Sequence, residues 1–291
     1  MSKAIESSSS ISGKFCAQDL WALMNIGKDC PAPEDSSMKE EFLNPLFIRA
    51  IRAGDIEKVR LLIELGVDIN DLEPNSWTPL HYAACCGRCE ILKLLIQNGA
   101  ILDAVCSGPE KMGQTPLYQA ALMNHVDCAK TLLLHGATIS LGSEGICEPL
   151  LIAVFKGHVK MVALFLDYGA NVNTRFTNNF FELFKYALPL EVWKDQDLPL
   201  LHYAILMKSN KIAAFLVLRG ADINIETRSG NTTLLQAIKA NNIEIARYLV
   251  TKRLKVDNTW RWWVADEVLI KDETFNKDQI NGLNFICPEF L

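Results

Sequence analysis

Hydrophobic and polar residues alternate with a helical period in the middle of the chain. In the run TPLHYAACCGRCEILKLLIQNGA, apolar side chains follow the i, i+3, i+4 spacing of one helix face twice, at Leu80, Ala83 and Ala84 and again at Ile91, Leu94 and Leu95. Thr78 before Pro79 is a typical helix start, because threonine caps the helix and proline needs no hydrogen-bond acceptor at its first position. Gly87 interrupts the run and Gly99 closes it. The pattern therefore predicts two short helices, each with one apolar face.

The same pattern returns along the chain with a longer period. The glycine that closes the second helix recurs with steps of 33, 37, 33 and 51 residues, at Gly66, Gly99, Gly136, Gly169 and Gly220. An alanine of the first helix recurs in parallel, at Ala50, Ala83, Ala120, Ala153, Ala204 and Ala237. One such unit cannot bury its own apolar face, so six units must stack on one another. We predict a curved solenoid with a concave groove.

The residues inside the unit resemble a known family. Thr78-Pro79-Leu80-His81-Tyr82-Ala83-Ala84 and Thr115-Pro116-Leu117-Tyr118-Gln119-Ala120-Ala121 are similar to the T-P-L-H-x-A-A run of ankyrin repeats, and ELGVDIN, DYGANVN and LRGADIN are similar to their G-A-D-x-N run. The resemblance covers about residues 44–258. It implies an all-α ankyrin solenoid of stacked helix-turn-helix units, with helical extensions at both ends and a role in binding other proteins.

The segments outside the period divide the chain further. Residues 1–43 are expected to form a serine-rich disordered start, a capping helix at 14–30 and a linker, followed by the six repeats at 44–258. The step of 51 residues contains an insertion at about 174–197 with six aromatic residues, which is either a flap folded on its own repeat or a binding loop. The tail 259–291 begins with tryptophans and either caps the last repeat or recruits a second protein.

Charge and composition exclude several classes of function. With 29 basic and 34 acidic residues the net charge is −5 at pH 7, so nucleic acid and anionic membranes are disfavoured as partners. The longest clean apolar run, 212–218, is too short to cross a membrane, and the first thirty residues lack the apolar core of a signal peptide. Nine scattered cysteines fit reduced thiols better than a disulfide framework. We expect an intracellular protein, in the cytoplasm or the nucleus, that does not insert into membranes.

The residue types that carry catalysis have structural explanations. All five histidines stand at positions where ankyrin repeats use polar residues, and no nucleophile or phosphate-binding motif occurs. We therefore predict no enzymatic activity and no cofactor. The cluster Cys85-Cys86-Gly87-Arg88-Cys89 could begin a zinc site if two more ligands converged on it, although packing or surface thiols explain it more simply, so no metal is expected.

The resemblance also indicates a partner-binding surface. In ankyrin proteins the groove is lined by the residue before the T-P-L-H threonine and by the two residues after the alanine pair. The predicted partner-binding residues are Trp77, Cys85, Cys86, Gln114, Leu122, Met123, Phe155, Lys156, Leu198, Leu206, Met207 and Asn231. The central positions are unusually apolar, which favours either a hydrophobic partner segment, such as an amphipathic helix or an extended segment, or cover by the 174–197 insertion.

Two functions remain open on these observations. The first is a non-catalytic adaptor or scaffold that holds a protein partner in the groove, in a eukaryotic signalling pathway or as a microbial effector acting in host cells. The alternative is the substrate-recognition subunit of a cullin-type ubiquitin ligase, whose ankyrin members carry a C-terminal SOCS box. Residues 259–291 lack the Leu-Cys-Arg core of that box, and Cys287-Pro288 is a poor trace of it, so this alternative requires a divergent form.

Overall fold

A computed structural model describes residues 36–72, 77–106, 113–140, 148–177 and 197–254. The chain divides into two compact units, residues 1–68 and 69–291. In the first unit, helix α2 (Ser36–Ala53) packs against α3 (Ile56–Glu64). The side chain of Asp55 caps α3 by accepting a hydrogen bond from the backbone N–H of Lys58 at 3.1 Å. Helix α2 begins at Ser36, which lies before residue 44, the predicted start of the repeats.

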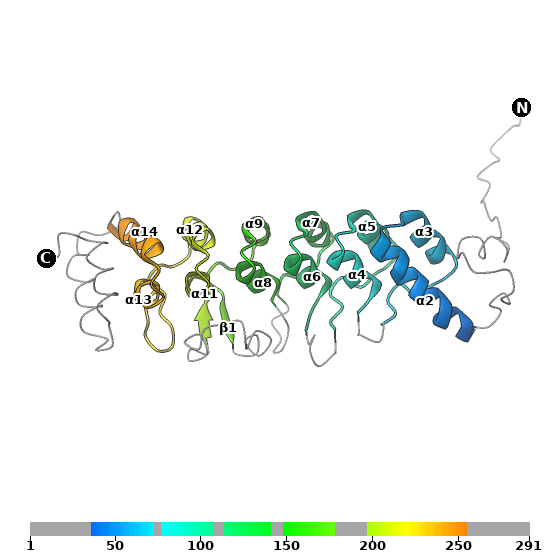
Figure 1. The fold of residues 1–291 in the computed structure, drawn as a ribbon, viewed down its shortest axis with the longest axis horizontal. Helices are drawn as coiled ribbons and strands as arrows, with labels where there is room; N and C mark the ends of the chain where they lie inside the picture. Colours follow the sequence, from blue (N-terminus) through cyan, green and yellow to red (C-terminus); the bar gives the residue numbers. More distant parts are fainter. Residues whose placement is uncertain (1–35, 73–76, 107–112, 141–147, 178–196, 255–291) are drawn as a thin grey trace, which may run out of the picture. The chain divides into compact units, whose positions relative to one another are not determined.

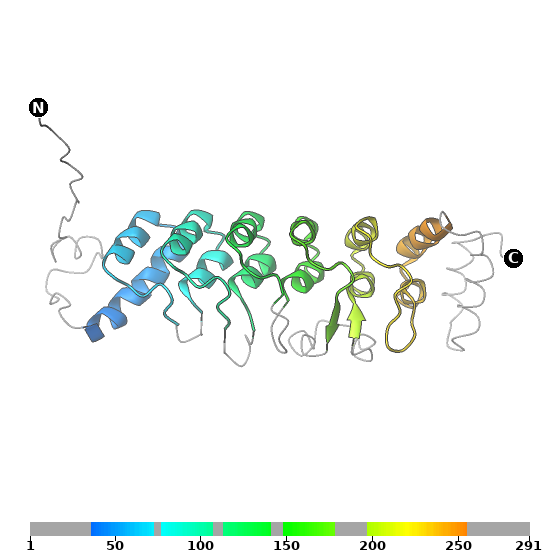
Figure 2. The same cartoon turned by 180° about the vertical axis from the view of Figure 1, so that it is seen from behind.

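The second unit is a stack of helix pairs. The pairs are α4 (Pro79–Cys85) with α5 (Cys89–Gln97), α6 (Pro116–Leu122) with α7 (Val126–Leu134), α8 (Pro149–Phe155) with α9 (Val159–Asp167), α11 (Leu200–Leu206) with α12 (Asn210–Leu218), and α13 (Thr233–Lys239) with α14 (Ile243–Leu254). Figure 1 and the reverse view in Figure 2 show the first helices in one layer and the second helices in another, with the loops on the side of the first helices. Each first helix packs on the next first helix, and each second helix on the next second helix. The predicted all-α repeat fold is confirmed.

The alanine of the first helix explains why the pairs stack so closely. Ala83, Ala120, Ala153, Ala204 and Ala237 all have 0% exposure. A methyl side chain lets neighbouring helices approach at these positions, while the larger apolar residues beside them fill the core. The repeated alanine in the sequence therefore marks the contact line between neighbouring first helices.

Local sequence sets where the helices begin and turn. The backbone N–H of Thr78 donates to Nδ1 of His81 at 3.1 Å, and the two residues form a capping box at the start of α4. The turn after α4 needs glycine at Gly87, whose φ is +66° and where an added Cβ would lie 2.7 Å from the ring of His125. Lys208 has a φ of +53° at the corresponding turn after α11.

The insertion starts and ends in a short hairpin. Strands β1 (Arg175–Thr177) and β2 (Asp197–Pro199) pair antiparallel, with Arg175 opposite Pro199 and Thr177 opposite Asp197. The hairpin brings both ends of the insertion together directly before α11. Residues 178–196 of the insertion lie outside the described residues, as do the predicted disordered start, the helix at 14–30 and the tail 259–291.

Side chains in the loops link neighbouring repeats. Each acceptor lies four residues after the glycine that closes a second helix, and each donor is the backbone N–H two residues after the next such glycine. The three links join Oδ1 of Asn70 to N of Ile101 (2.9 Å), Oδ1 of Asp103 to N of Thr138 (3.0 Å), and Oδ1 of Asn173 to N of Asp222 (2.8 Å). A polar residue at this position of the repeat thus connects one loop to the next.

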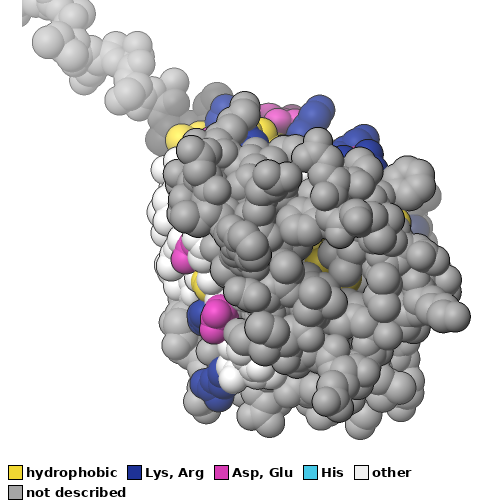
Figure 3. Space-filling model, turned by 90° about the vertical axis from the view of Figure 1, so that its left-hand side faces the viewer, with side chains coloured by type: hydrophobic (Ala, Val, Ile, Leu, Met, Phe, Trp, Pro, Cys, Tyr) yellow, Lys and Arg dark blue, Asp and Glu magenta, His cyan; other side chains and the backbone are white. Residues whose placement is uncertain are grey.

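Described side chains of both charge signs are visible at the end of the chain near α14 (Figure 3). In Figure 3, which views the chain from the side of α14, the visible described side chains include basic and acidic groups near one another.

Within the part of the chain that the structure describes, no helix is both long and apolar enough to cross a membrane.

Candidate protein-binding surface

The last residue of each first helix and the residue that follows it form a row along the layer of first helices. We call these ten residues the inner-helix row: Cys85 and Cys86 of α4, Leu122 and Met123 of α6, Phe155 and Lys156 of α8, Leu206 and Met207 of α11, and Lys239 and Ala240 of α13. Because the first helices pack on one another in this order, equivalent positions recur along the layer. The structure therefore brings eight of the predicted partner-binding residues into one row.

Exposure separates the members of this row. Met123 is 50% exposed and Lys156 is also exposed, whereas Leu122, Phe155 and Met207 are half-buried, as are the two cysteines. Leu206 is only 8% exposed, so this predicted partner-binding residue offers little surface to a partner. The accessible apolar part of the row is therefore centred on α6 and α8.

The four predicted residues that precede first helices have other contacts. The ring of Trp77 lies edge-on to Tyr82, with centroids 5.1 Å apart, and stacks on His81. Leu198 lies in β2 and is 1% exposed, so it is not available to a partner. The side-chain amides of the other two residues are hydrogen-bonded within their own repeats: Oε1 of Gln114 accepts from Nε2 of Gln119 at 2.6 Å, and Oδ1 of Asn231 accepts from Nζ of Lys239 at 3.1 Å.

Phe155 and Lys156 combine an apolar face with a positive charge. Nζ of Lys156 lies 5.6 Å from the centroid of the Phe155 ring, which is within the range of a cation–π contact. Leu122 and Met123 occupy the equivalent positions of the neighbouring repeat, whose first helix α6 packs on α8. A partner with an apolar ridge and an acidic flank would match this part of the row.

The histidines hold neighbouring repeats together. His81 is fully buried, its Nε2 donates to the carbonyl of Gln114 at 3.1 Å, and burial lowers its pKa to about 4. The ring is therefore neutral at physiological pH and has both nitrogens hydrogen-bonded. His125 and His158 likewise reach the carbonyls of Cys85 and Leu122 in the preceding repeat, at 3.1 and 3.4 Å.

The other two histidines are also hydrogen-bonded. Nε2 of His202 lies 2.9 Å from the carbonyl oxygen of Ile225 in the next repeat, and Nδ1 of His135 lies 2.8 Å from that of Thr131 within its own helix pair. All five imidazoles thus have structural partners. The absence of enzymatic activity remains a prediction.

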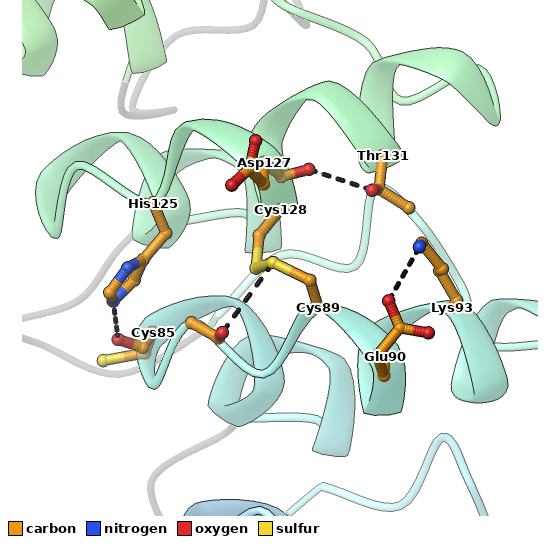
Figure 4. Close-up of a disulfide and its surroundings, with 9 residues drawn as sticks. Cys85, Cys89, Glu90, Lys93, His125, Asp127, Cys128 and Thr131 are labelled. Atoms are coloured by element: carbon orange, nitrogen blue, oxygen red, sulfur yellow. Dashed lines mark hydrogen bonds and ion pairs between the residues drawn. A yellow bond between two sulfur atoms is a disulfide. The ribbon is translucent and has the colours of Figure 1, made fainter.

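The expectation of reduced thiols is wrong for two cysteines. Cys89 at the start of α5 and Cys128 in the first turn of α7 form a disulfide, with Cα atoms 5.0 Å apart (Figure 4). The bond joins the second helices of two neighbouring repeats. Cys89 is consequently not available as a zinc ligand, and the described residues contain no group of three or more side chains that could hold a metal. Because two of the cysteines form this bond, the cysteine content no longer indicates a reducing compartment.

A sequence signal for this bond existed. Cys89 and Cys128 both stand near the start of a second helix, and the repeat model predicts that consecutive second helices pack side by side. The number of cysteines and their scatter along the chain do not reveal the bond, because they leave out the position of each cysteine in its repeat.

Comparison with known sequences identifies the repeat. A family model described as "Ankyrin repeats (3 copies)" matches residues 21–106, 46–143, 106–176 and 176–260, which together make up most of the chain. The chain belongs to the ankyrin repeat family. Ankyrin repeats generally mediate protein–protein interaction.

Relatives with this repeat are larger proteins. The chain is 31% identical over 275 residues to the human transient receptor potential cation channel subfamily A member 1, covering 85% of this chain and 24% of the channel. It is 25% identical over 226 residues to the putative palmitoyltransferase ZDHHC13 of Danio rerio, covering 77% of this chain and 31% of that protein. This ankyrin chain therefore spans less than half the length of either relative.

A solved structure also resembles this ankyrin chain. The human ASB11 ankyrin repeat domain matches with a TM-score of 0.48 and 22% sequence identity, over 66% of this chain and 90% of that domain.

Proposed function

We propose that this ankyrin chain is a non-catalytic adaptor that binds a protein partner along the inner-helix row. The observation that carries the proposal is the cluster of accessible apolar side chains at the centre of the row. Met123 is 50% exposed, the half-buried Leu122 precedes it, and the half-buried Phe155 occupies the equivalent part of the next repeat. Apolar anchors flanked by polar groups are typical of protein interfaces, where a few such residues provide most of the binding energy.

The chemistry of the cluster suggests the kind of partner. A methionine adapts its shape to an apolar surface, and an aromatic ring beside it offers a large rigid contact. Lys156 adds a positive charge at the edge. An amphipathic partner helix with an apolar face and an acidic residue next to it would satisfy all three features.

We favour the adaptor over a ubiquitin-ligase receptor or an enzyme. The receptor hypothesis depends on residues 259–291, which lie outside the described residues, and the similarity to the ASB11 domain carries no argument for it. The buried, hydrogen-bonded histidines support a structural role for these side chains. An effector role in host cells and a cytoplasmic location remain expectations from the sequence alone.

Site-specific crosslinking tests the proposal. A photoreactive amino acid replaces Met123 in one protein and Leu134 in another, because Leu134 is 65% exposed but lies on the second helix of the same repeat. After irradiation in cells of the source organism, mass spectrometry compares the captured proteins. We expect a partner that crosslinks from position 123 and not from position 134.

A variant then tests whether the contact contributes affinity. Phe155→Ala should weaken binding of the captured partner at least tenfold, because truncated interface anchors typically cost about 2 kcal/mol or more. Leu134→Ala is the control and should bind like the unsubstituted protein. Equal capture from both positions, or unchanged binding by a folded Phe155→Ala protein, would contradict the proposal.

A further inference from the structure

A pocket of about 450 Å³ lies between two neighbouring repeats, α6/α7 and α8/α9. Its walls come from the end of α7, the start of α8 and the end of α9, and they include Leu133, Leu150 and the ring of Tyr168. Ser140 and Glu148 add polar groups to the lining. This volume falls in the range of sites that bind small molecules or single side chains.

The pocket lies where the link between neighbouring loops is broken. Ser140 occupies the repeat position from which Asn70, Asp103 and Asn173 reach the next loop. Its Oγ instead donates to Oε1 of Glu148 at 2.7 Å. The backbone N–H of Asn171 occupies the repeat position of the donors at Ile101, Thr138 and Asp222, but no side chain among the described residues accepts a hydrogen bond from it. Asn171 also lines the pocket. The missing link thus coincides with an open space that contains a carboxylate.

Among the described residues, Glu148 has no counter-charge in this space. None of the described lining residues is a lysine, arginine or histidine, and no described residue forms an ion pair with Glu148. Burial raises the pKa of this carboxyl group, and the hydrogen bond from Ser140 opposes part of that rise. The ionised form is therefore less well solvated here than at the surface.

Two of the three helices around the pocket add to the negative potential. The start of α8 has the opposite polarity, but this helix has only seven residues. Helices α7 and α9 both end at the pocket wall, and the C-terminal end of a helix carries a partial negative charge. Both helices are nine residues long, which is enough for aligned peptide dipoles. A cation in the pocket would be attracted by the carboxylate and by both helix ends.

We propose that this pocket binds a guanidinium group on an apolar stem, the chemistry of an arginine side chain. A carboxylate can accept about four hydrogen bonds and Ser140 provides one, so Glu148 can still receive the forked donors of a guanidinium. The planar cation can stack on Tyr168, which is 37% exposed, while its stem contacts Leu133 and Leu150. Glu148 precedes α8, at the opposite end from Phe155 and Lys156, so the inference does not depend on the proposed function.

Nuclear magnetic resonance titration of the full chain tests this inference. The probes are n-butylguanidinium, a short peptide with a single arginine, and the same peptide with neutral citrulline at that position. We expect saturable shifts of the amide signals of Ser140, Asn171 and Thr174 with the guanidinium probes. The dissociation constant of the citrulline peptide should be at least tenfold larger than that of the arginine peptide. If the arginine peptide and the free guanidinium both bind, the pocket accepts a protein side chain; if only the free guanidinium binds, the ligand is a small molecule.

Matched variants separate a specific site from a general charge effect. Glu148→Gln keeps the size of the side chain and an acceptor for Ser140, and it should weaken guanidinium binding at least tenfold. Glu90→Gln removes an exposed carboxylate that pairs with Lys93 at 2.8 Å and should leave binding unchanged. Unaltered signals away from the pocket verify that each variant is folded. Equal binding of arginine and citrulline, equal binding by Glu148→Gln, or no saturable shift would overturn the proposal.

Discussion

The disulfide between Cys89 and Cys128 leads to a quantitative prediction about stability. The bond closes a loop between residues 39 positions apart. In the chain-entropy description, a crosslink over such a loop removes enough freedom from the unfolded chain to stabilise the fold by about 4 kcal/mol. Reduction of the native protein should therefore lower its free energy of unfolding by up to about this amount.

Urea unfolding with and without a phosphine reductant measures this difference. The double variant Cys89→Ala/Cys128→Ala is the control. It loses the same packing energy with and without reductant, and because it has no disulfide, its free energy of unfolding should not respond to reductant. Cys128 has 0% exposure, so the variant alone would mix the loss of the crosslink with the loss of packing. The informative quantity is thus the response to reductant in each protein, not the difference between the two proteins.

Two results would refute this reasoning. One is a urea midpoint of the unsubstituted protein that does not respond to reductant. The other is alkylation of both cysteines in protein that has never met a reductant, detected by peptide mass spectrometry. Either result would mean that the two thiols lie side by side without forming the bond.

Three further predictions concern single side chains. Gly157→Ala should lower the free energy of unfolding in urea by about 1–2 kcal/mol, because an alanine must then adopt a positive φ. Gly87→Ala should lower it by about 1 kcal/mol more, because the added Cβ would also displace the ring of His125. Equal losses for the two variants would contradict this. Folding lowers the pKa of His81 from 6.5 to about 4, so between these values the unfolded chain binds more protons than the folded one. The contribution of His81 to stability should therefore fall by about 3 kcal/mol as the pH drops through this range, and this contribution should be absent in His81→Gln. Lys208→Gly should raise the free energy of unfolding by about 0.5–1 kcal/mol by relieving a positive φ, and a decrease would count against the assignment of strain there.

Much of the fold was predictable because the relevant interactions are local or periodic. The capping at Thr78 and the turn at Gly87 depend on residues a few positions apart. The stacking alanines depend on a contact between equivalent positions of neighbouring repeats, and a period reveals such contacts without any knowledge of the remaining structure. The sequence alone therefore determined the family, the helix pairs and the line along which they stack.

The candidate sites were predictable only in part. The repeat placed Met123 and Phe155 on the inner-helix row, but it did not indicate how much of each predicted side chain is exposed. Leu198 lies in β2 and is 1% exposed, whereas Met123 is 50% exposed. The exposure of the predicted residues was consequently a property of the folded chain.

The disulfide and the pocket were decided by tertiary structure. A bond between Cys89 and Cys128 requires their Cα atoms to lie 5.0 Å apart, which depends on how far one second helix is shifted along the next. At the pocket, Ser140 has a shorter side chain than Asn70 and Asn173, and it bonds to Glu148 instead of to the next loop. The sequence determined which groups recur at each repeat position, whereas packing between the repeats determined which of those groups meet.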